Sequence, residues 1–345
     1  LFAAAVPVRA QSQHFEKVIV LKNGGTSAAW GDYNNDGWVD LDADGDLWRN
    51  DHGTLSFVPN SGLESRGIWA DFNNDGWLDV FRYASEQQVY LNDQKGGFTT
   101  RPHDEIGATN SQGAIAGDLN GDGFPDVYVG AYETWPSRNF ADKIAMGDGK
   151  GKLTVTWTQG LDTVMTPGRP RPARGVTSAD WDRDGDIDIY VSNYRLEPNI
   201  LWRNDGAGKF VDVAQTHNAL GTSPGFPGGH TIGSVFGDFD NDGLIDLFVG
   251  NFAHSGQPQS RFLKNLGPEQ DYKFEDKGTG GIPLQESYAS PTAGDIDNDG
   301  DLDLYFTTVY ATATGGLVNH PVLLRNDGNF HFTDVTNLGC SNHQM

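Results

Sequence analysis

The chain has 345 residues, and its 47 aspartates and glutamates outnumber its 24 lysines and arginines, so the formal net charge is −23 at pH 7. Because such a surface repels phosphates, nucleic acids and anionic membranes are excluded as direct partners unless cations intervene. Hydrophobic residues make up 37% of the chain and aromatic residues 11%, which is enough for a folded core. The single cysteine excludes an intrachain disulfide, and no apolar run reaches the roughly 18 residues of a membrane-spanning helix.

The N-terminal segment indicates secretion. Residues 1–10 have the composition of the end of a signal peptide, with the small residues Val8 and Ala10 before a cleavage point at Gln11. An ordinary apolar N-terminus is the alternative. We therefore expect residues 11–345 to form a single domain of an extracellular protein. Residues 14–21 favour a strand that precedes the first repeat without companion strands of its own.

One nine-residue motif recurs six times and sets the organisation of the chain. It has aspartate at positions 1, 5 and 9, asparagine or aspartate at position 3, and glycine at position 6. The copies, which we number as acidic loops 1 to 6, occupy residues 32–40, 71–79, 118–126, 180–188, 238–246 and 295–303. Their starts lie 39 to 62 residues apart, which is the period of a four-stranded propeller blade.

A frame of four short strands surrounds the motif. A small or apolar stretch precedes each copy, and a strand of alternating character follows it. A third strand carries a Leu-x-Arg/Lys-Asn signature, as in residues 47–50 and 201–204. A fourth strand opens with phenylalanine, namely Phe57, Phe98, Phe210, Phe274 and Phe332. These patterns predict an all-β protein, a β-propeller of four-stranded blades with six repeat units, in which each acidic loop joins the first strand to the second.

The motifs, together with the Phe-Thr-Asp-Val-Thr run at 332–336, resemble the FG-GAP or VCBS repeat of integrin-alpha-like β-propellers and are most similar to the cartilage-acidic-protein group. The resemblance covers about residues 14–336 and implies calcium in the acidic loops and, usually, seven blades. Six units are complete here. We expect a seventh blade in the full-length protein beyond a truncated C-terminus, with residues 14–21 closing the ring. Closure with six blades, or pairing of this strand with a neighbouring copy, are the alternatives.

The acidic loops have the chemistry of calcium sites. Ca²⁺ takes about six to eight oxygen ligands, which a loop supplies from side chains at positions 1, 3, 5 and 9 and a backbone carbonyl at position 7. The flanking strands and the lack of glutamate at position 12 exclude an EF-hand. The predicted ligands are Asp32, Asn34, Asp36, Trp38, Asp40, Asp71, Asn73, Asp75, Trp77, Asp79, Asp118, Asn120, Asp122, Phe124, Asp126, Asp180, Asp182, Asp184, Asp186, Asp188, Asp238, Asp240, Asp242, Leu244, Asp246, Asp295, Asp297, Asp299, Asp301 and Asp303.

Charge supports this interpretation, because crowded carboxylates repel one another without a cation. Up to six Ca²⁺ would bind, one per repeat. Loops 1 to 3 carry asparagine at position 3, so we expect weaker binding there than in loops 4 to 6. A solvated acidic turn without metal is the alternative, and Mg²⁺ is the alternative ion. The overlapping aspartates of residues 40–46 are expected to form a strand and a turn rather than an extra site.

The longest insertions fall on the face opposite to the acidic loops, because successive turns of an antiparallel sheet lie at opposite ends. They cover about residues 131–142, 163–175, 214–232, 253–261, 278–291 and 311–321. Aromatic, arginine and histidine side chains on such a face suit carbohydrate, and suit extracellular protein partners equally. The predicted ligand-binding residues are Trp135, Arg138, Arg169, Arg171, Arg174, His217, His230, His254, Tyr288 and Tyr310.

The basic run at 167–174 favours an anionic ligand such as a uronate or a sulfate; the alternative is a stiff loop whose arginines pair with nearby carboxylates. We expect a secreted, calcium-stabilised binding or adhesion module for carbohydrate or cell-surface ligands. A self-assembling filament or surface-layer subunit and a polysaccharide lyase are the alternatives. No catalytic residue is assigned, since the familiar hydrolase, metalloprotease and nucleotide motifs are absent from the sequence. A lyase would need a histidine and a tyrosine beside a cation, for which the chain offers His217, His230, Tyr194 and Arg195.

Overall fold

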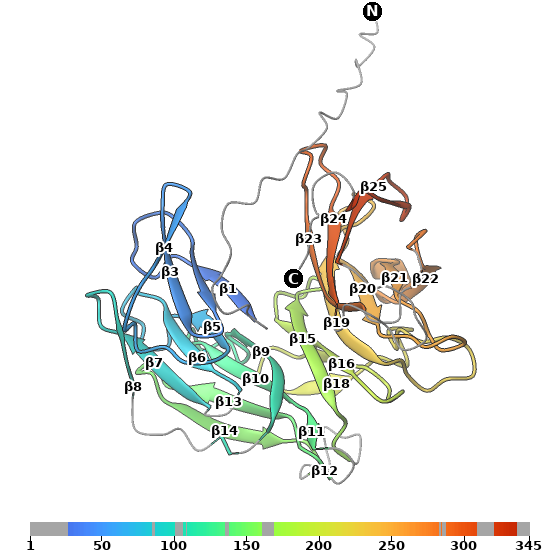
Figure 1. Ribbon diagram of the computed structural model, residues 1–345. Coiled ribbons are helices and arrows are strands. Elements are labelled where there is room, and N and C mark those ends of the chain that lie inside the picture. Colours follow the sequence, from blue (N-terminus) through green and yellow to red (C-terminus); the bar gives the residue numbers. More distant parts are fainter. Residues whose placement is uncertain are drawn as a thin grey trace, which may run out of the picture.

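The computed structural model describes residues 27–84, 87–100, 106–107, 109–134, 138–160, 169–282, 284, 288–308 and 321–336. In these residues, six antiparallel sheets of four strands each follow one another along the chain as the blades of a β-propeller (Figure 1). The predicted all-β propeller of four-stranded blades is confirmed. Residues 1–10 and the predicted strand 14–21 lie outside the described residues.

The strands of each blade follow one another from the centre outward. Blade 1 contains β1 (Ala28–Gly31), β2 (Asp40–Ala43), β3 (Asp46–Asp51) and β4 (Thr54–Phe57), and blade 2 contains β5 (Gly67–Ala70), β6 (Asp79–Arg82), β7 (Gln88–Asn92) and β8 (Phe98–Thr100). Blade 3 contains β9 (Ser111–Gly117), β10 (Asp126–Ala131), β13 (Lys143–Gly147) and β14 (Leu153–Thr158), and blade 4 contains β15 (Ala173–Ala179), β16 (Asp188–Asn193), β17 (Ile200–Asn204) and β18 (Phe210–Asp212). Blade 5 contains β19 (Thr231–Gly237), β20 (Asp246–Asn251), β21 (Arg261–Asn265) and β22 (Phe274–Gly278), and blade 6 contains β23 (Tyr288–Gly294), β24 (Asp303–Thr308), β25 (Val322–Asn326) and β26 (Phe332–Asp334).

Two small elements lie between these strands. The hairpin of β11 (Glu133–Thr134) and β12 (Arg138–Asn139) is inserted between β10 and β13. The 3-10 turn η1 (Pro268–Gln270) lies between β21 and β22. Within the described ranges, no helix has the length and apolar character needed to cross a membrane.

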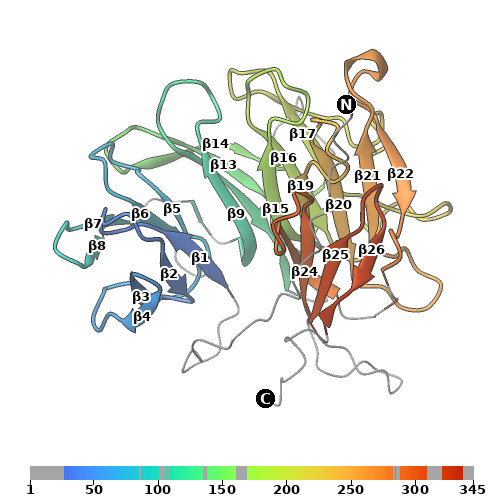
Figure 2. The same ribbon diagram turned by 90° about the horizontal axis from the view of Figure 1, so that it is seen from above.

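The innermost strands pack against one another in the order β1, β5, β9, β15, β19 and β23. Figures 1 and 2 show the six blades arranged as an arc, with blades 1 and 6 at its two ends. Because each blade turns its faces toward its neighbours, the second strand of an interior blade is covered on both sides. Accordingly, every residue of β10, β16 and β20 is buried.

The apolar core lies between blades. The core cluster around Tyr128 of blade 3 also contains Trp202 of blade 4. Trp181 at position 2 of acidic loop 4 is buried, and its ring centroid lies 5.5 Å from that of Phe274 in blade 5. The aromatic residues of the repeats therefore join neighbouring blades, which ties the position of each acidic loop to the packing of the ring.

The asparagine of the third-strand signature is a polar link between blades. Nδ2 of Asn204 donates to the backbone carbonyl of Leu119 in the preceding blade at 2.9 Å and to that of Ile187 in its own blade at 3.2 Å. Asn92, Asn265 and Asn326 make the same pair of bonds. Among the described residues, the Asn50 side chain in blade 1 donates within its own blade alone, to Val39 O at 2.9 Å.

Blade 1 departs from the expected position of the fourth-strand phenylalanine. In blades 2, 4, 5 and 6 that residue opens the strand opposite the signature asparagine, but Asn50 pairs with Leu55, and Phe57 ends β4 with half of its surface exposed. The prediction for Phe57 was wrong because the preceding turn is short. His52 and Gly53 form it with φ angles of 54° and 91°, which shifts the register.

Residues 40–46 form strand β2, a turn and the first residue of β3, as expected. Asp42 lies in β2 and is buried, and its Oδ1 accepts the Gly45 N–H at 2.8 Å. Burial raises the pKa of Asp42 to about 6. The carboxylate of Asp42 therefore stabilises the turn between β2 and β3.

Candidate functional site

Each acidic loop is folded by its own aspartates. In loop 2, Oδ1 of Asp71 accepts the N–H of Asp75 at 3.0 Å, and Oδ2 accepts the N–H of Gly76 at 2.8 Å. Gly76 has a φ of 85°, a left-handed conformation that glycine adopts without strain. Loops 1, 3 and 5 repeat this pattern, so positions 1, 5 and 6 form the tight turn that the sequence predicts.

The aspartate at position 9 joins its loop to the third strand of the blade. Oδ2 of Asp79 accepts the N–H of Phe72 at 3.0 Å, and Oδ1 accepts the N–H of Asn92 at 2.8 Å. Its equivalents are all buried, namely Asp40, Asp126, Asp188, Asp246 and Asp303. Burial raises the pKa of Asp79 and Asp126 to about 6 and that of Asp246 to about 7. These carboxylates thus stabilise the loop whether or not they also contact an ion.

Position 3 divides the loops into two groups. In loops 1 to 3, the asparagine Nδ2 donates to Oδ2 of the position-5 aspartate. These distances are 2.9 Å for Asn34 to Asp36, 3.0 Å for Asn73 to Asp75 and 3.0 Å for Asn120 to Asp122. The amide N–H of the asparagine therefore offsets part of the negative charge of the position-5 carboxylate, a role that a metal ion would otherwise have.

In loops 4 to 6, position 3 is an aspartate, which cannot donate when ionised. Oδ1 of Asp182, of Asp240 and of Asp297 is buried without a hydrogen-bond partner in the described residues. Each lies in a group of three carboxylates whose oxygens are within 4.8 Å of one another, namely Asp180, Asp182 and Asp188 in loop 4, Asp238, Asp240 and Asp246 in loop 5, and Asp295, Asp297 and Asp299 in loop 6.

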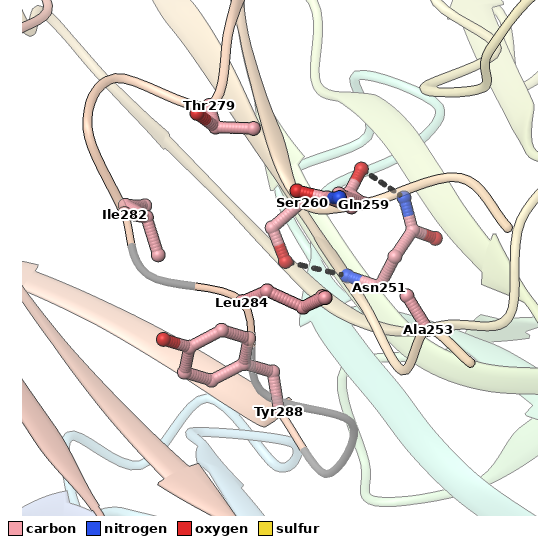
Figure 3. Close-up of a pocket in the computed structure, with 8 residues that line it drawn as sticks. All are labelled: Asn251, Ala253, Gln259, Ser260, Thr279, Ile282, Leu284 and Tyr288. Carbon is pink, nitrogen blue, oxygen red and sulfur yellow. Dashed lines mark hydrogen bonds between the residues drawn. The ribbon is translucent and has the colours of Figure 1, made fainter. Parts of the chain in front are cut away.

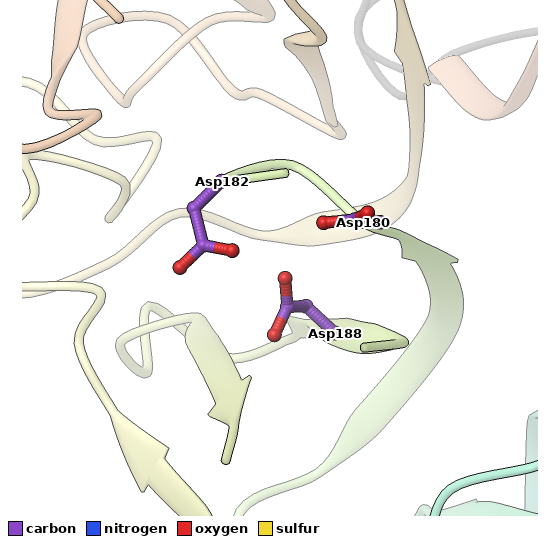
Figure 4. A group of neighbouring side chains, drawn as sticks. All are labelled: Asp180, Asp182 and Asp188. Atoms are coloured by element: carbon purple, nitrogen blue, oxygen red, sulfur yellow. The ribbon is translucent and has the colours of Figure 1, made fainter. Parts of the chain in front are cut away.

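Loop 4 contains the acidic-loop carboxylate whose pKa is raised furthest. Figure 4 shows Asp182 and Asp188 pointing their carboxylates into the same space beside Asp180. Oδ2 of the fully buried Asp188 has no hydrogen-bond partner in the described residues. Burial, and then the charges of Asp182 and Asp184, raise the pKa of Asp188 to about 8. Converging oxygen atoms without donors are the ligands that Ca²⁺ prefers, so these residues fit the predicted ion.

Loop 5 already contains a cation. Nζ of Lys264, from the third strand, bonds Oδ2 of Asp240 and lies 2.6 Å from Oδ2 of Asp242. The two carboxylates raise the pKa of the lysine against the opposing effect of burial. Loops 4 and 6 therefore have the stronger need for a metal. The part of the position-7 carbonyls in metal binding stays a prediction.

On the opposite face, the arginines of the basic run are paired. Nη2 of Arg169 lies 2.5 Å from Oε1 of Glu197, and Nη1 of Arg171 donates to the carbonyl of Pro198 at 3.0 Å. Arg169 thus pairs with a carboxylate, as the alternative expects, whereas the partner of Arg171 is a backbone carbonyl. Trp135 and Tyr310 lie outside the described residues, as does the side chain of Arg138.

A different set of side chains comes together where blades 3, 4 and 5 meet. The guanidinium carbon of Arg174 lies 4.3 Å from the ring centroid of Tyr132 and 5.1 Å from that of Tyr194. The Tyr194 ring lies 4.6 Å from that of His230, which in turn lies 6.3 Å from that of His254. We call the residues at its centre the tyrosine–arginine cluster: Tyr132, Glu133, Arg174, Tyr194, Arg195 and His230.

Ionic contacts fix the cluster. Nε of Arg195 donates to Oε1 of the buried Glu133 at 2.9 Å, and Nη2 of Arg195 lies 2.8 Å from the same oxygen. Nη2 of Arg174 donates to the Tyr132 hydroxyl at 3.0 Å. Burial, followed by the neighbouring His254 and Arg195, lowers the pKa of His230 to about 4. The imidazole of His230 is therefore neutral at pH 7.

Two predicted residues lie apart from this cluster. His217 is buried against Trp181 of acidic loop 4, with ring centroids 5.4 Å apart. Tyr288 is buried against Phe306 and lines a pocket between blades 5 and 6 whose volume is about 10 Å³, room for one water molecule (Figure 3). Both side chains serve packing in this structure.

The sequence prediction missed Tyr132, Glu133 and Phe252, whose ring centroid lies 6.5 Å from that of Tyr194, and used Tyr194 and Arg195 only for the lyase alternative. A repeat-based signal for three of them exists. Tyr132, Tyr194 and Phe252 each follow the last residue of the second strand, in blades 3, 4 and 5. Aligning the repeats at the ends of the second strands would have placed these aromatic residues on one rim of the propeller.

Comparison with known proteins agrees with this architecture. Cartilage acidic protein 1 of Xenopus tropicalis is 28% identical over 211 residues, which cover 57% of this chain and 28% of the relative. The human protein of the same name is 30% identical over 146 residues, which cover 38% of this chain and 19% of the relative. The matched region is thus under a third of the length of these relatives.

A solved structure shows the same fold at lower identity. It is a lectin of Agrocybe aegerita, described as recognising non-reducing terminal N-acetylglucosamine; it is 16% identical with a TM-score of 0.54, over 90% of this chain and 80% of the lectin. The model of the FG-GAP-like repeat matches residues 71–129, 180–249 and 238–306, which together span more than half of the chain. The chain belongs to the FG-GAP-like repeat family.

Proposed function

We propose that this protein is a secreted, calcium-stabilised propeller that binds carbohydrate through the face opposite to its acidic loops. The observation that carries the proposal is that two chemically different groups of side chains lie on opposite faces of the propeller. Partnerless carboxylate oxygens converge in loops 4 to 6, whereas the tyrosine–arginine cluster lies at the other ends of the strands. One face supplies a structural role for the ion, and the other supplies contacts for a ligand.

Calcium has a structural role in this proposal. An ion that binds the folded chain and not the unfolded chain adds its binding free energy to stability. Extracellular calcium near millimolar would suffice even for loops of low affinity. This requirement supports an extracellular location, and so does the likeness to cartilage acidic protein 1.

Carbohydrate is the ligand class that the side chains favour. Tyrosine rings, arginine guanidinium groups and histidine offer apolar contact and directed hydrogen bonds to sugar hydroxyls. The lectin of similar fold supports a binding role. The pocket beside Tyr288 is too small for a sugar ring, so the ligand would lie on the open face.

Glycan-array binding in 1 mM calcium tests the proposal. We expect binding of a defined group of glycans, its loss in the double variant Tyr132→Ala and Tyr194→Ala, and retention in Val211→Ser, a change of an exposed residue on the outer strand β18. A folded wild-type protein that binds no glycan but captures an extracellular protein would contradict it and favour adhesion to protein.

A polysaccharide lyase is the second candidate, favoured by one contact. Tyr194 and His230 touch, and the guanidinium carbon of Arg195 lies 5.3 Å from the Tyr194 centroid, so three of the four residues considered for a lyase are together. His217 is elsewhere. A rise in ultraviolet absorbance from unsaturated ends, on incubation with an acidic polysaccharide, would show this activity; its absence leaves the binding module.

A further inference from the structure

The tyrosine–arginine cluster is a positive site in a strongly negative chain. Arg174 and Arg195 face a single carboxylate among the cluster residues, that of Glu133, while the net charge of the chain is −23. His230 adds no charge at neutral pH. The local excess is one positive charge, which attracts an anion at short range although the whole molecule repels it.

Both arginines lie at irregular positions of the backbone. Arg174 is the extra residue of a β-bulge, since Ala173 pairs with Asn193 and Gly175 pairs with Ser192. A bulge redirects the side chain of the added residue, and bulges are common beside binding sites. Arg195 has a φ of 63°, a left-handed conformation that is costly for a residue with a side chain.

Two buried atoms of the cluster lack partners. Nε of Arg174, a donor, and Nδ1 of His230 make no hydrogen bond in the part of the chain that the structure describes. Buried polar groups without partners are uncommon in native proteins and are a reason to look for a ligand or a water. Both atoms belong to side chains that pack on Tyr194 from blades 4 and 5.

The other arginines of the basic run do not offer the same chemistry. Arg169 is neutralised by Glu197, and Arg171 donates to a backbone carbonyl. The anionic ligand expected from the sequence is therefore better served by Arg174, which has no carboxylate partner among the described residues, with Arg195 beside it held in place by Glu133. A planar guanidinium matches a carboxylate through two parallel hydrogen bonds.

We propose that the tyrosine–arginine cluster is a subsite for an acidic sugar, binding the carboxylate of a hexuronate unit through Arg174 and Arg195 and a ring hydroxyl through His230. The proposal rests on the proposed function, that the chain binds carbohydrate. It adds the class of sugar and the residues that select it.

Two tetrasaccharides of similar size test the subsite by isothermal titration calorimetry in 1 mM calcium. Hyaluronan tetrasaccharide carries uronate carboxylates, whereas chitotetraose is neutral. We expect Arg174→Gln and Arg195→Gln each to weaken hyaluronan binding at least tenfold and to leave any chitotetraose binding unchanged. Arg169→Gln, the matched control from the same basic run, should change hyaluronan binding less than twofold. Thermal unfolding of each variant shows that it is folded.

The outcomes separate the two proposals. Equal hyaluronan binding by wild type and both cluster variants, or no hyaluronan binding by the wild type, overturns the acidic subsite. In either case, binding of chitotetraose or of other neutral glycans leaves the proposed function standing, and its absence on a full array contradicts that function as well. Dextran sulfate separates the two anions, because binding of dextran sulfate without hyaluronan contradicts a carboxylate ligand.

Discussion

Asp142 is a buried carboxylate at the corner between the second and third strands of blade 3. Its Oδ1 accepts the N–H of Ala131 at 2.7 Å, and its Oδ2 accepts the hydroxyl of Tyr128 at 2.7 Å. Complete burial raises the pKa of Asp142 to about 7, against the smaller opposing effect of these hydrogen bonds. A carboxylate at this corner therefore makes folding sensitive to pH near neutrality.

Blade 4 has the same corner with an amide in place of the acid. Oδ1 of Asn199 accepts the N–H of Asn193 at 2.8 Å, and its Nδ2 donates to the Tyr190 hydroxyl at 2.9 Å. The two corners differ in charge and in hydrogen bonding, because Nδ2 of Asn199 also donates to the carbonyl of Leu220 at 3.0 Å and to Oγ1 of Thr231 at 2.9 Å. Only the corner of blade 3 contains a group that ionises between pH 5 and pH 8.

Asp142→Asn is expected to reduce the loss of stability between pH 5 and pH 8. In the wild type, the Asp142 carboxyl ionises near pH 3.8 in the unfolded chain and only near pH 7 in the folded protein. Its contribution to the free energy of unfolding is therefore fully present below pH 3.8 and is lost as the pH rises through 7. The change amounts to about 2–3 kcal/mol between pH 5 and pH 8. Urea unfolding at several pH values, in constant calcium, measures it.

The reciprocal variant is the control. Asn199→Asp should make the free energy of unfolding fall further over the same pH range, as Asp142 does in blade 3. The other carboxylates with a raised pKa are present in all three proteins and contribute equally to each. An unfolding midpoint that falls as steeply in Asp142→Asn as in the wild type would show that Asp142 does not titrate in this range.

At the scale of elements, the acidic loops should fall into two functional groups. Asp182→Asn gives loop 4 the position-3 amide of loops 1 to 3, which can donate to the position-5 carboxylate. We therefore expect a smaller rise of melting temperature on adding calcium, and weaker binding of one ion in a binding titration. A site saturated at 100 times its Kd contributes about 2.7 kcal/mol to stability.

The control is the opposite change in loop 2, where Asn73 already donates to the position-5 aspartate. Asn73→Asp removes the donor from loop 2 and should increase the response to calcium while lowering stability in a chelator. Wild-type melting temperatures that are equal in calcium and in EDTA would falsify the metal assignment for all six loops.

The inter-blade asparagines should contribute according to the number of carbonyls they bind. Asn204→Ala leaves two backbone carbonyls without a donor, those of Leu119 and Ile187, and is expected to cost about 2–4 kcal/mol. Asn50→Ala removes one such bond and should cost about 1 kcal/mol. Chemical denaturation measures both, and equal losses would contradict a role in joining blades.

The elements could be predicted because each blade repeats the same local chemistry, whereas the ligand face could not. Position 3 of the acidic loops distinguished the two groups from sequence, since an amide donates and an ionised carboxylate cannot. In the tyrosine–arginine cluster, the repeat places Tyr132 and Tyr194 at equivalent positions after the second strands, whereas Glu133, Arg174, Arg195 and His230 have no counterpart of the same type in the other blades. Only the packing of blade 4 on blade 3 brings Arg174 onto Tyr132, and no spacing in the sequence encodes that contact.

On the scale of the whole molecule, the two ends of the arc expose the surfaces that join blades elsewhere. The side chain at position 8 of a loop packs on the last glycine of the preceding first strand, as Leu302 does on Gly237. Val39 holds this position in blade 1 and is 54% exposed, and Trp30 is 56% exposed. No described atom lies within 4 Å of where a Cβ of Gly294 would stand in blade 6.

These two faces complement each other as the faces of consecutive blades do. In the 345-residue chain, the same faces should join copies head to tail. Light scattering at increasing protein concentration measures this association.

Val39→Lys and Gly294→Glu each place a charge in one of the faces, and each should raise the concentration needed for association at least tenfold. Val211→Lys, which charges an exposed site on β18 in blade 4, should not. A wild-type chain that stays monomeric at all concentrations would contradict head-to-tail contact. If Val211→Lys alone abolishes association, the contact lies on the outer edge of blade 4. Burial of the exposed apolar side chains of that edge would then drive the association.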